Sequence, residues 1–158
     1  MRPYLLKQVV SDRGEVLQES EPELLGQPIS RSTALQMQRM LARVVSEEDG
    51  TGTKARVEGY SVGGKTGTAQ KVKPREEGGG YYDKRFTSSF VGFIPVENPQ
   101  IAIIVVADDP GVYTESGRKI SYYGGTVCGP AFRDIAEFSV RYLRISPEGR
   151  TVYMNRFE

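Results

Sequence analysis

An unbroken apolar run, Ile101 to Ala107, constrains the fold of this chain more than any other feature of the sequence. Seven apolar residues are too few to span a bilayer, and they are typical of a β-strand that is buried on both faces. A turn is expected over Glu97 to Gln100, and Phe86 to Val96 has the composition of a second strand. The sequence therefore predicts an antiparallel pair of strands in the hydrophobic core.

Two further β-elements are expected upstream of this pair. Residues 55 to 72 have no helical period and carry several glycines among β-branched residues, so a strand is predicted over Val62 to Val72. A glycine-rich loop, Lys73 to Arg85, is expected to follow it. Near the start of the chain, Tyr4 to Val10 and Glu15 to Leu17 flank a cluster of turn-forming residues, which predicts a hairpin.

Two helices are expected, one before the three strands in the chain and one after them. Thr33 and Gln36 have the spacing of a capping box, and the apolar residues after them recur on one helical face. These are Met37, Met40, Leu41, Val44 and Val45. Pro130 suits the first turn of a second helix, which should end near Arg144. Its apolar positions are Phe132, Ile135, Ala136, Tyr142 and Leu143.

The order hairpin, helix, three strands and helix predicts an α+β fold with a mainly antiparallel β-sheet flanked by helices. A length of 158 residues fits one domain with one compact core. The long connection from Asp108 to Gly125 can either line a cleft or simply be mobile, and the sequence leaves both open.

The composition excludes several classes of function. With 21 basic and 20 acidic residues, the formal charge of +1 favours no nucleic acid and no anionic membrane. The chain has no histidine, which excludes Ser-His-Asp catalysis and imidazole zinc sites. Its one cysteine, Cys128, permits no thiolate cluster and is expected to be a small buried residue. We therefore expect neither a metal nor a cofactor.

Residues Gly59 to Thr66 match the phosphate-loop pattern G-x-x-x-x-G-K-[ST]. Such a loop must connect a buried strand to a helix whose N-terminus faces the phosphates. The preceding Thr51 to Glu58 is polar, and Pro74 follows too closely for a helix. A nucleotide-binding protein is an alternative that the flanking residues disfavour.

The same residues contain Lys65-Thr66-Gly67, the K-T-G element of penicillin-binding proteins and β-lactamases. Several blocks around it resemble, in order and spacing, the C-terminal part of the transpeptidase domain of class B penicillin-binding proteins. They are Gly59-Tyr60, Gly63 to Gln70, Val91 to Pro95, Tyr122 to Gly125 and Gly129 to Phe132. The resemblance extends from about Pro3 to Leu143 and is greatest to the proteins that build the division septum. It assigns residues 1–158 to this part of the domain, with 144–158 as a variable tail.

The resemblance implies a penicillin-binding-protein or β-lactamase-like fold and a peptidoglycan D,D-transpeptidase reaction. The acyl group of a D-Ala-D-Ala stem peptide passes to a serine and then to an amine, and β-lactams acylate the same serine. In this family Lys65 and the Thr66 and Thr68 hydroxyls would hold the terminal carboxylate, and the Thr68 N–H would be one oxyanion donor. Gly67 lacks a Cβ, so an extended peptide could lie against this strand and pair with it as an added strand. Gly64 could likewise allow the peptide to come close to the backbone.

The nucleophile of such a site is missing from this sequence. The S-x-x-K string at Ser116 to Lys119 is interpreted as a coincidence, because it follows the K-T-G strand and lies in a polar loop. No S-x-N string occurs in the sequence. The chain alone is therefore expected to be inactive. The parent would be anchored in the cytoplasmic membrane, with this domain outside it, and would bind other division or cell-wall synthesis proteins. A homodimer through an exposed sheet or helix surface is expected, and a non-catalytic interaction module is a further alternative.

Overall fold

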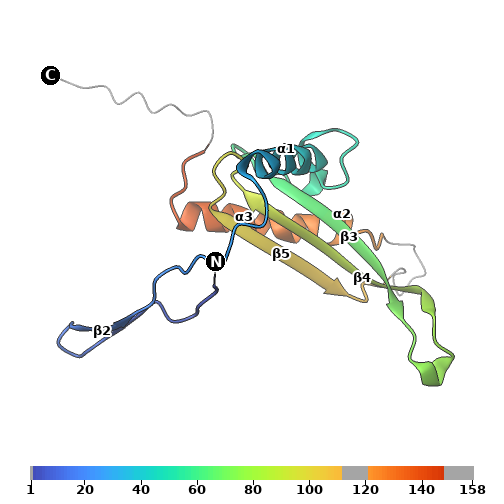
Figure 1. The fold of residues 1–158 in the computed structure, drawn as a ribbon. Helices are drawn as coiled ribbons and strands as arrows, with labels where there is room; N and C mark the ends of the chain where they lie inside the picture. The colour runs from blue at the N-terminus through green and yellow to red at the C-terminus, as the bar shows by residue number, and fades with distance from the viewer. Residues whose placement is uncertain (1, 112–120, 148–158) are drawn as a thin grey trace. The chain divides into compact units, whose positions relative to one another are not determined.

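The computed structural model describes residues 2–111 and 121–147, and the chain divides into two compact units, Met1–Leu35 and Gln36–Glu158 (Figure 1). The expectation that one domain accounts for the whole chain stays a prediction. All residues of the buried core cluster belong to the second unit. In the first unit, large apolar side chains such as Leu5 and Leu24 are exposed.

The regular elements follow one another in a mixed α and β order. They are β1 (Gln8–Val10), β2 (Val16–Glu19), α1 (Arg31–Ser46), the 3₁₀ helix η1 (Thr53–Ala55), β3 (Gly63–Val72), the 3₁₀ helix η2 (Arg75–Glu77), β4 (Tyr81–Ile94), β5 (Ile101–Asp108), α2 (Gly124–Val127) and α3 (Gly129–Tyr142). The predicted hairpin, both long helices and the three strands are confirmed, with shifted boundaries.

The first unit contains the predicted hairpin, in which β1 and β2 pair antiparallel. The turn is stabilised by the Ser11 hydroxyl, which accepts hydrogen bonds from the backbone N–H groups of Arg13 and Glu15 at 3.3 and 3.1 Å. Gly14 has a positive φ of 80°, a conformation that glycine adopts without a Cβ penalty. Strand β1 is shorter than the predicted Tyr4 to Val10, because pairing begins at Gln8, whereas β2 begins one residue and ends two residues later than the predicted Glu15 to Leu17.

Helix α1 begins one turn earlier than the predicted capping box. The Ser30 hydroxyl accepts a hydrogen bond from the Thr33 N–H at 3.1 Å, so Ser30 caps the helix and Thr33 lies within its first turn. At the other end, the Arg56 guanidinium donates to the last backbone carbonyls of the helix, including that of Val45 at 2.8 Å. Of the five predicted core positions, Val45 alone is buried, and Met40 is 60% exposed.

The second unit is built on a three-stranded antiparallel sheet in the order β3-β4-β5. Lys65 pairs with Val91 and Val91 pairs with Ile104, which fixes the register across all three strands. Strand β4 begins at Tyr81, so the predicted loop over Lys73 to Arg85 is too long. Three consecutive glycines, 78 to 80, have positive φ angles and make the turn compact enough for pairing to resume at once.

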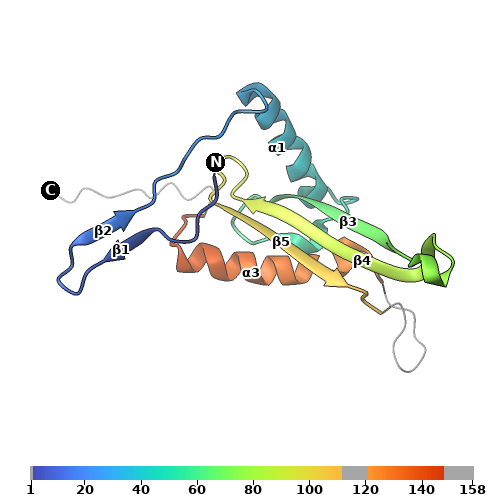
Figure 2. The same cartoon turned by 60° about the horizontal axis from the view of Figure 1, so that its bottom comes forward.

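One face of this sheet is covered by α2 and by α3, and Figure 2 shows α3 running alongside the strands. Phe90 of β4 meets Phe132 of α3 edge to face, with ring centroids 4.8 Å apart, and both side chains are fully buried. Pro130 lies in the first turn of α3, as predicted. Ile103 and Val105 of β5 pack against the same core. This face therefore holds most of the apolar burial of the second unit.

The opposite face of the sheet is open among the described residues. Ile104 is 66% exposed and Val106 is 55% exposed, and Val91 beside them on β4 is 48% exposed. The prediction that Ile101 to Ala107 is buried on both faces is wrong for this structure. The apolar run indicates a strand correctly, but burial of its second face needs a covering layer that the described residues do not supply.

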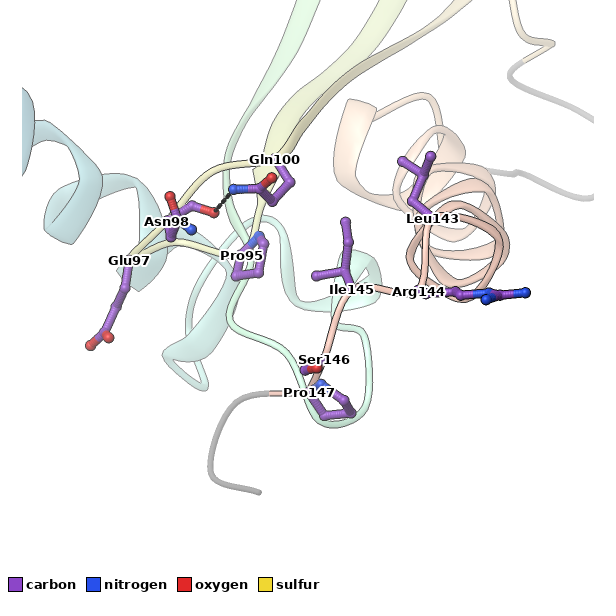
Figure 3. A pocket seen from close by; sticks show the side chains of 9 residues that line it. All are labelled: Pro95, Glu97, Asn98, Gln100, Leu143, Arg144, Ile145, Ser146 and Pro147. Carbon is purple, nitrogen blue, oxygen red and sulfur yellow. Dashed lines mark hydrogen bonds between the residues drawn. The ribbon is translucent and has the colours of Figure 1, made fainter. Parts of the chain in front are cut away.

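A cavity of about 530 Å³ lies at the end of the sheet where β4 turns into β5 (Figure 3). Its walls are the β4–β5 turn, including Pro95 and Gln100, and the chain that follows α3 from Leu143 to Pro147. Gln100 donates a hydrogen bond to the Asn98 carbonyl across this turn at 3.2 Å. No residue of the K-T-G element lines the cavity.

Candidate active site

The K-T-G element lies inside strand β3, at one edge of the sheet. Side chains alternate along a strand, so Lys65 and Gly67 belong to the open face while Thr66 and Thr68 belong to the helix-covered face. Because Lys65 lies inside the strand and is not at the start of a helix, the phosphate-loop geometry is absent. The nucleotide-binding alternative is therefore wrong.

The Lys65 ammonium contacts the next residue of the strand, Thr66. Lys65 Nζ lies 3.0 Å from the Thr66 carbonyl oxygen and 3.4 Å from Thr66 Oγ1. Thr66 Oγ1 is also 3.1 Å from the hydroxyl of Thr51, which comes from the turn after α1. One positive charge and one hydroxyl, which start on opposite faces of the strand, are thus brought together at its free edge.

Thr68 is held by the segment that leads into α2. The backbone N–H of Gly124 donates to Thr68 Oγ1 at 3.2 Å. The neighbouring Ser88 hydroxyl donates to the carbonyl of Tyr122, and the Tyr122 ring stacks on Phe86 with centroids 4.0 Å apart. The Thr68 oxygen therefore accepts a hydrogen bond from within the protein. The hydroxyl proton of Thr68 remains available for donation to an anion.

The two glycines predicted at the site are in different environments. Gly64 is buried, and a Cβ there would come within 2.5 Å of the Phe90 ring, so packing alone requires glycine at this position. Gly67 is half-buried, and a Cβ would meet the Ser89 hydroxyl at 2.5 Å, an atom that can rotate away. The prediction that Gly64 and Gly67 allow a substrate to approach stays a prediction.

The outer edge of β3 carries groups that can donate hydrogen bonds to an anion. Among the described residues, β3 pairs with β4 alone, so its other edge has no strand partner. An ammonium and two hydroxyls lie along it, and hydrogen bonds from such donors to a charged acceptor contribute about 1.5 to 3 kcal/mol each. The described residues include no cluster of three or more metal-ligating side chains.

The remaining sequence candidates lie elsewhere or outside the described residues. Ser116 and Lys119 fall in the range 112–120, which the structure does not describe. Cys128 is fully buried, with its thiol 3.4 Å from the Ser88 carbonyl, which confirms the expected small buried residue. Burial raises the pKa of this thiol, so it is not an activated nucleophile.

Sequence reasoning missed Thr51 and Gly124 as neighbours of the K-T-G threonines. Thr51 is 15 residues from Thr66, and Gly124 is 56 residues from Thr68. A Cβ on Gly125 would collide with the backbone carbonyl of Thr51. The two consecutive glycines, 124 and 125, are therefore the sequence signal that this backbone packs closely against the segment containing Thr51.

Comparison with known proteins gives the family to which this α+β fold and its strand-edge site belong. Residues 1–137 match the family described as penicillin binding protein transpeptidase domain. The chain belongs to this family.

Individual relatives agree with this assignment. The chain is 38% identical over 119 residues to a probable peptidoglycan D,D-transpeptidase of Neisseria flavescens, covering 75% of this chain and 27% of that protein. It is 36% identical over 146 residues to the stage V sporulation protein D of Bacillus subtilis, covering 92% of this chain and 21% of that protein. The chain thus spans about a quarter of these curated relatives.

Solved structures show the same fold. The apo transpeptidase domain of Burkholderia pseudomallei penicillin-binding protein 3 is 40% identical, with a TM-score of 0.62, and the match covers 76% of this chain and 33% of that one. Penicillin-binding protein 3 of Mycobacterium tuberculosis, solved in complex with ampicillin, is 26% identical with a TM-score of 0.72 over 93% of this chain and 32% of that one. The predicted α+β fold is confirmed.

Proposed function

We propose that this chain forms the carboxylate-binding half of a peptidoglycan D,D-transpeptidase site. Lys65, Thr66 and Thr68 would hold the terminal carboxylate of a D-Ala-D-Ala stem peptide or of a β-lactam. The observation that carries the proposal is the contact of the Lys65 ammonium with Thr66 on a strand whose outer edge is unpaired among the described residues, with the Thr68 hydroxyl two residues further along the same strand. The Mycobacterium tuberculosis relative was solved in complex with ampicillin, which supports a β-lactam as a ligand of this site.

The backbone of β3 supports a second role. Lys65 donates to the Thr66 carbonyl, so that carbonyl is accessible from the free edge. In an antiparallel strand the N–H and C=O of one residue point to the same side, and residues two apart point alike. The Thr68 N–H is therefore directed to the same edge, where it would stabilise the oxyanion of the acyl-transfer step. Removing one such donor typically costs about 10²- to 10³-fold in turnover.

The serine of this reaction would come from polypeptide outside this sequence. The described residues hold neither S-x-x-K nor S-x-N, and the chain spans about a third of the solved relatives. Incubation of the chain alone with a fluorescent penicillin should give no covalent adduct. A stoichiometric adduct on this chain would contradict this part of the proposal.

Recognition of the carboxylate can be tested directly on the chain itself. A titration with an N-acyl-D-Ala-D-Ala peptide, followed by amide NMR, should shift the signals of residues 65 to 68. The matched peptide amide, which lacks the negative charge, should bind at least about tenfold more weakly, because it cannot form charge-assisted hydrogen bonds. Equal binding of acid and amide, or unchanged binding by Lys65→Ala, would refute the proposal.

The parent protein would work in cell-wall synthesis outside the cytoplasmic membrane. The relatives include peptidoglycan D,D-transpeptidases, which supports a cell-wall role. No helix among the described residues is long and apolar enough to cross a membrane. An anchoring segment and partners from the division machinery would belong to the parent, and fractionation of cells that express the full gene would test the placement.

A further inference from the structure

Thr51, in the turn after α1, is held against the K-T-G strand by close packing on both sides. Its hydroxyl lies 3.1 Å from Thr66 Oγ1, across 15 residues of sequence. The next residue, Gly52, is buried, and a Cβ there would come within 2.9 Å of the Phe90 ring. A Cβ on Gly125 would collide with the Thr51 carbonyl and would lie 3.1 Å from the Thr66 methyl carbon. The surrounding backbone therefore fixes the position of Thr51 beside Thr66.

The Thr66 hydroxyl has one proton to donate and two lone pairs that can accept. Lys65 Nζ lies 3.4 Å from Thr66 Oγ1, and an ammonium can only donate, so it occupies one lone pair. The contact with Thr51 joins two hydroxyls, either of which can be the donor. If Thr66 donates to Thr51, its single proton is used within the protein. If Thr51 donates to Thr66, both lone pairs are occupied and the Thr66 proton is free for a ligand.

The second of these arrangements is the one found at Thr68. A backbone N–H cannot accept, so the hydrogen bond from Gly124 makes the Thr68 oxygen the acceptor, at 3.2 Å. In both cases the contact comes from outside β3: from the first residue of α2 for Thr68, and from the turn after α1 for Thr66. The same arrangement at Thr66 gives both K-T-G hydroxyls a proton for one anion.

We propose that Thr51 is a positioning residue for carboxylate recognition, which donates to Thr66 Oγ1 and so directs the Thr66 proton to the bound anion. The inference rests on the proposed function, in which Thr66 holds the carboxylate. The two hydroxyls only rotate when the anion enters, so no proton is transferred and no charge changes. A peptide amide does not need this orientation, because its N–H can donate to Thr66 while Thr66 donates to Thr51. Thr51 therefore contributes to the preference for a carboxylate over an amide.

The size of the effect follows from the exposure of the pair. Loss of one net hydrogen bond weakens binding by about two- to tenfold. Thr51 is exposed and Thr66 is half-buried, so water can replace part of what the missing hydroxyl supplies. The expected loss is therefore about threefold, toward the lower end of this range.

The experiment compares a hydroxyl with a methyl group at position 51 of the full 158-residue chain. Thr51→Val keeps the shape of the side chain and removes the donor, whereas Thr51→Ser keeps the donor. Titrations with an N-acyl-D-Ala-D-Ala peptide and with its C-terminal amide give the ratio of acid to amide affinity. Thr51→Val should lower this ratio about threefold, and Thr51→Ser should leave it within about twofold of wild type. Thr53→Val makes the same chemical change in the adjoining η1, outside this contact, and should leave the ratio unchanged.

A double-mutant cycle tests whether Thr51 acts through Thr66. Thr66→Val removes the hydroxyl that Thr51 is proposed to orient, so adding Thr51→Val to it should have no further effect on the ratio. Additive losses would show that Thr51 acts by another route, such as direct contact with the carboxylate, and would overturn the positioning role.

Stability measurements separate positioning from a role in the fold. Thr51 is exposed, so Thr51→Val should unfold close to the wild-type temperature. Thr51→Ala is a second donor-free variant without the bulk of valine, and it should lower the ratio to the same extent. Unfolding of both donor-free variants, or equal weakening of acid and amide binding, would show that Thr51 serves the fold and would overturn the inference.

The wild-type titration distinguishes failure of this inference from failure of the proposed function. Equal binding of acid and amide by the wild-type chain would refute the proposed function, and the inference with it. A wild-type preference for the acid that Thr51→Val leaves unchanged would overturn the inference alone. A preference that falls in Thr51→Val and Thr51→Ala, and is retained in Thr51→Ser, is the result expected.

Discussion

Strand β3 presents an ammonium, two threonine hydroxyls and a half-buried glycine at its free edge, whereas the free edge of β5 is apolar from Ile101 to Ala107. Both strands pair with β4 and share its core, so the difference arises from their side chains and not from their position in the sheet. A polar edge with small residues suits a ligand that binds and leaves. An apolar edge suits polypeptide that stays bound.

The two edges depend on one core, and removing that core is the change with the largest expected effect. Phe132→Ala deletes a fully buried ring that packs against Phe90. The free energy of unfolding should fall by about 3 to 5 kcal/mol, and both edges should be lost together. Phe138→Ala, on the exposed side of the same helix, is the control and should change stability by less than about 1 kcal/mol. Urea denaturation measures both; equal losses would contradict the assigned burial.

Glycine substitutions sharpen the distinction between packing and ligand access at β3. Gly64→Ala should destabilise the fold by about 1 to 3 kcal/mol, because the new methyl group meets the Phe90 ring. Gly67→Ala should cost less than about 1 kcal/mol, because the Ser89 hydroxyl can rotate away. Gly67→Ala should nevertheless weaken binding of the D-Ala-D-Ala peptide. Thermal unfolding and peptide titration of both variants test this, and a stable Gly64→Ala protein would contradict it.

The smallest expected effect concerns the ion pair that links the two edge strands. Lys71 of β3 donates to both oxygens of Asp108 of β5, at 2.9 Å each, and this hydrogen bonding lowers the pKa of Asp108. A carboxyl with a lowered folded-state pKa stabilises the fold above its unfolded pKa of about 3.9 and loses this contribution as the pH falls through the folded value.

Asp108→Asn should therefore lower the melting temperature slightly at neutral pH, and the difference from wild type should vanish in strongly acidic solution. The Asp108 side chain is 69% exposed, so added salt should reduce the effect further. A difference that grows on acidification would show that the ion pair does not determine this pKa.

Local patterns were sufficient to predict most of the second unit. The apolar run of β5, the glycine-punctuated β3 and the helical spacing in α3 each encode their own secondary structure, so the elements could be predicted without their neighbours. The start of α1 was misplaced because Ser30 and Thr33 are both good caps, and the sequence does not show which hydroxyl meets an N–H.

The exposure of side chains could not be predicted, because it depends on what covers them. Ile104 and Met40 have the residue types of core positions, yet both are exposed here. The candidate site was found through the K-T-G element, but its supporting residues Thr51 and Gly124 were missed. They reach the threonines only after the chain has folded, and their polar contacts leave no periodic pattern in the sequence.

The most direct test of the central claim is to locate a bound carboxylate. A crystal structure of the chain with an N-acyl-D-Ala-D-Ala peptide should place the terminal carboxylate within hydrogen-bond distance of the Thr66 and Thr68 hydroxyls, beside the Lys65 ammonium, with the peptide along the free edge of β3. A peptide bound with its carboxylate elsewhere, such as at Lys73 in the β3–β4 turn, would contradict the account.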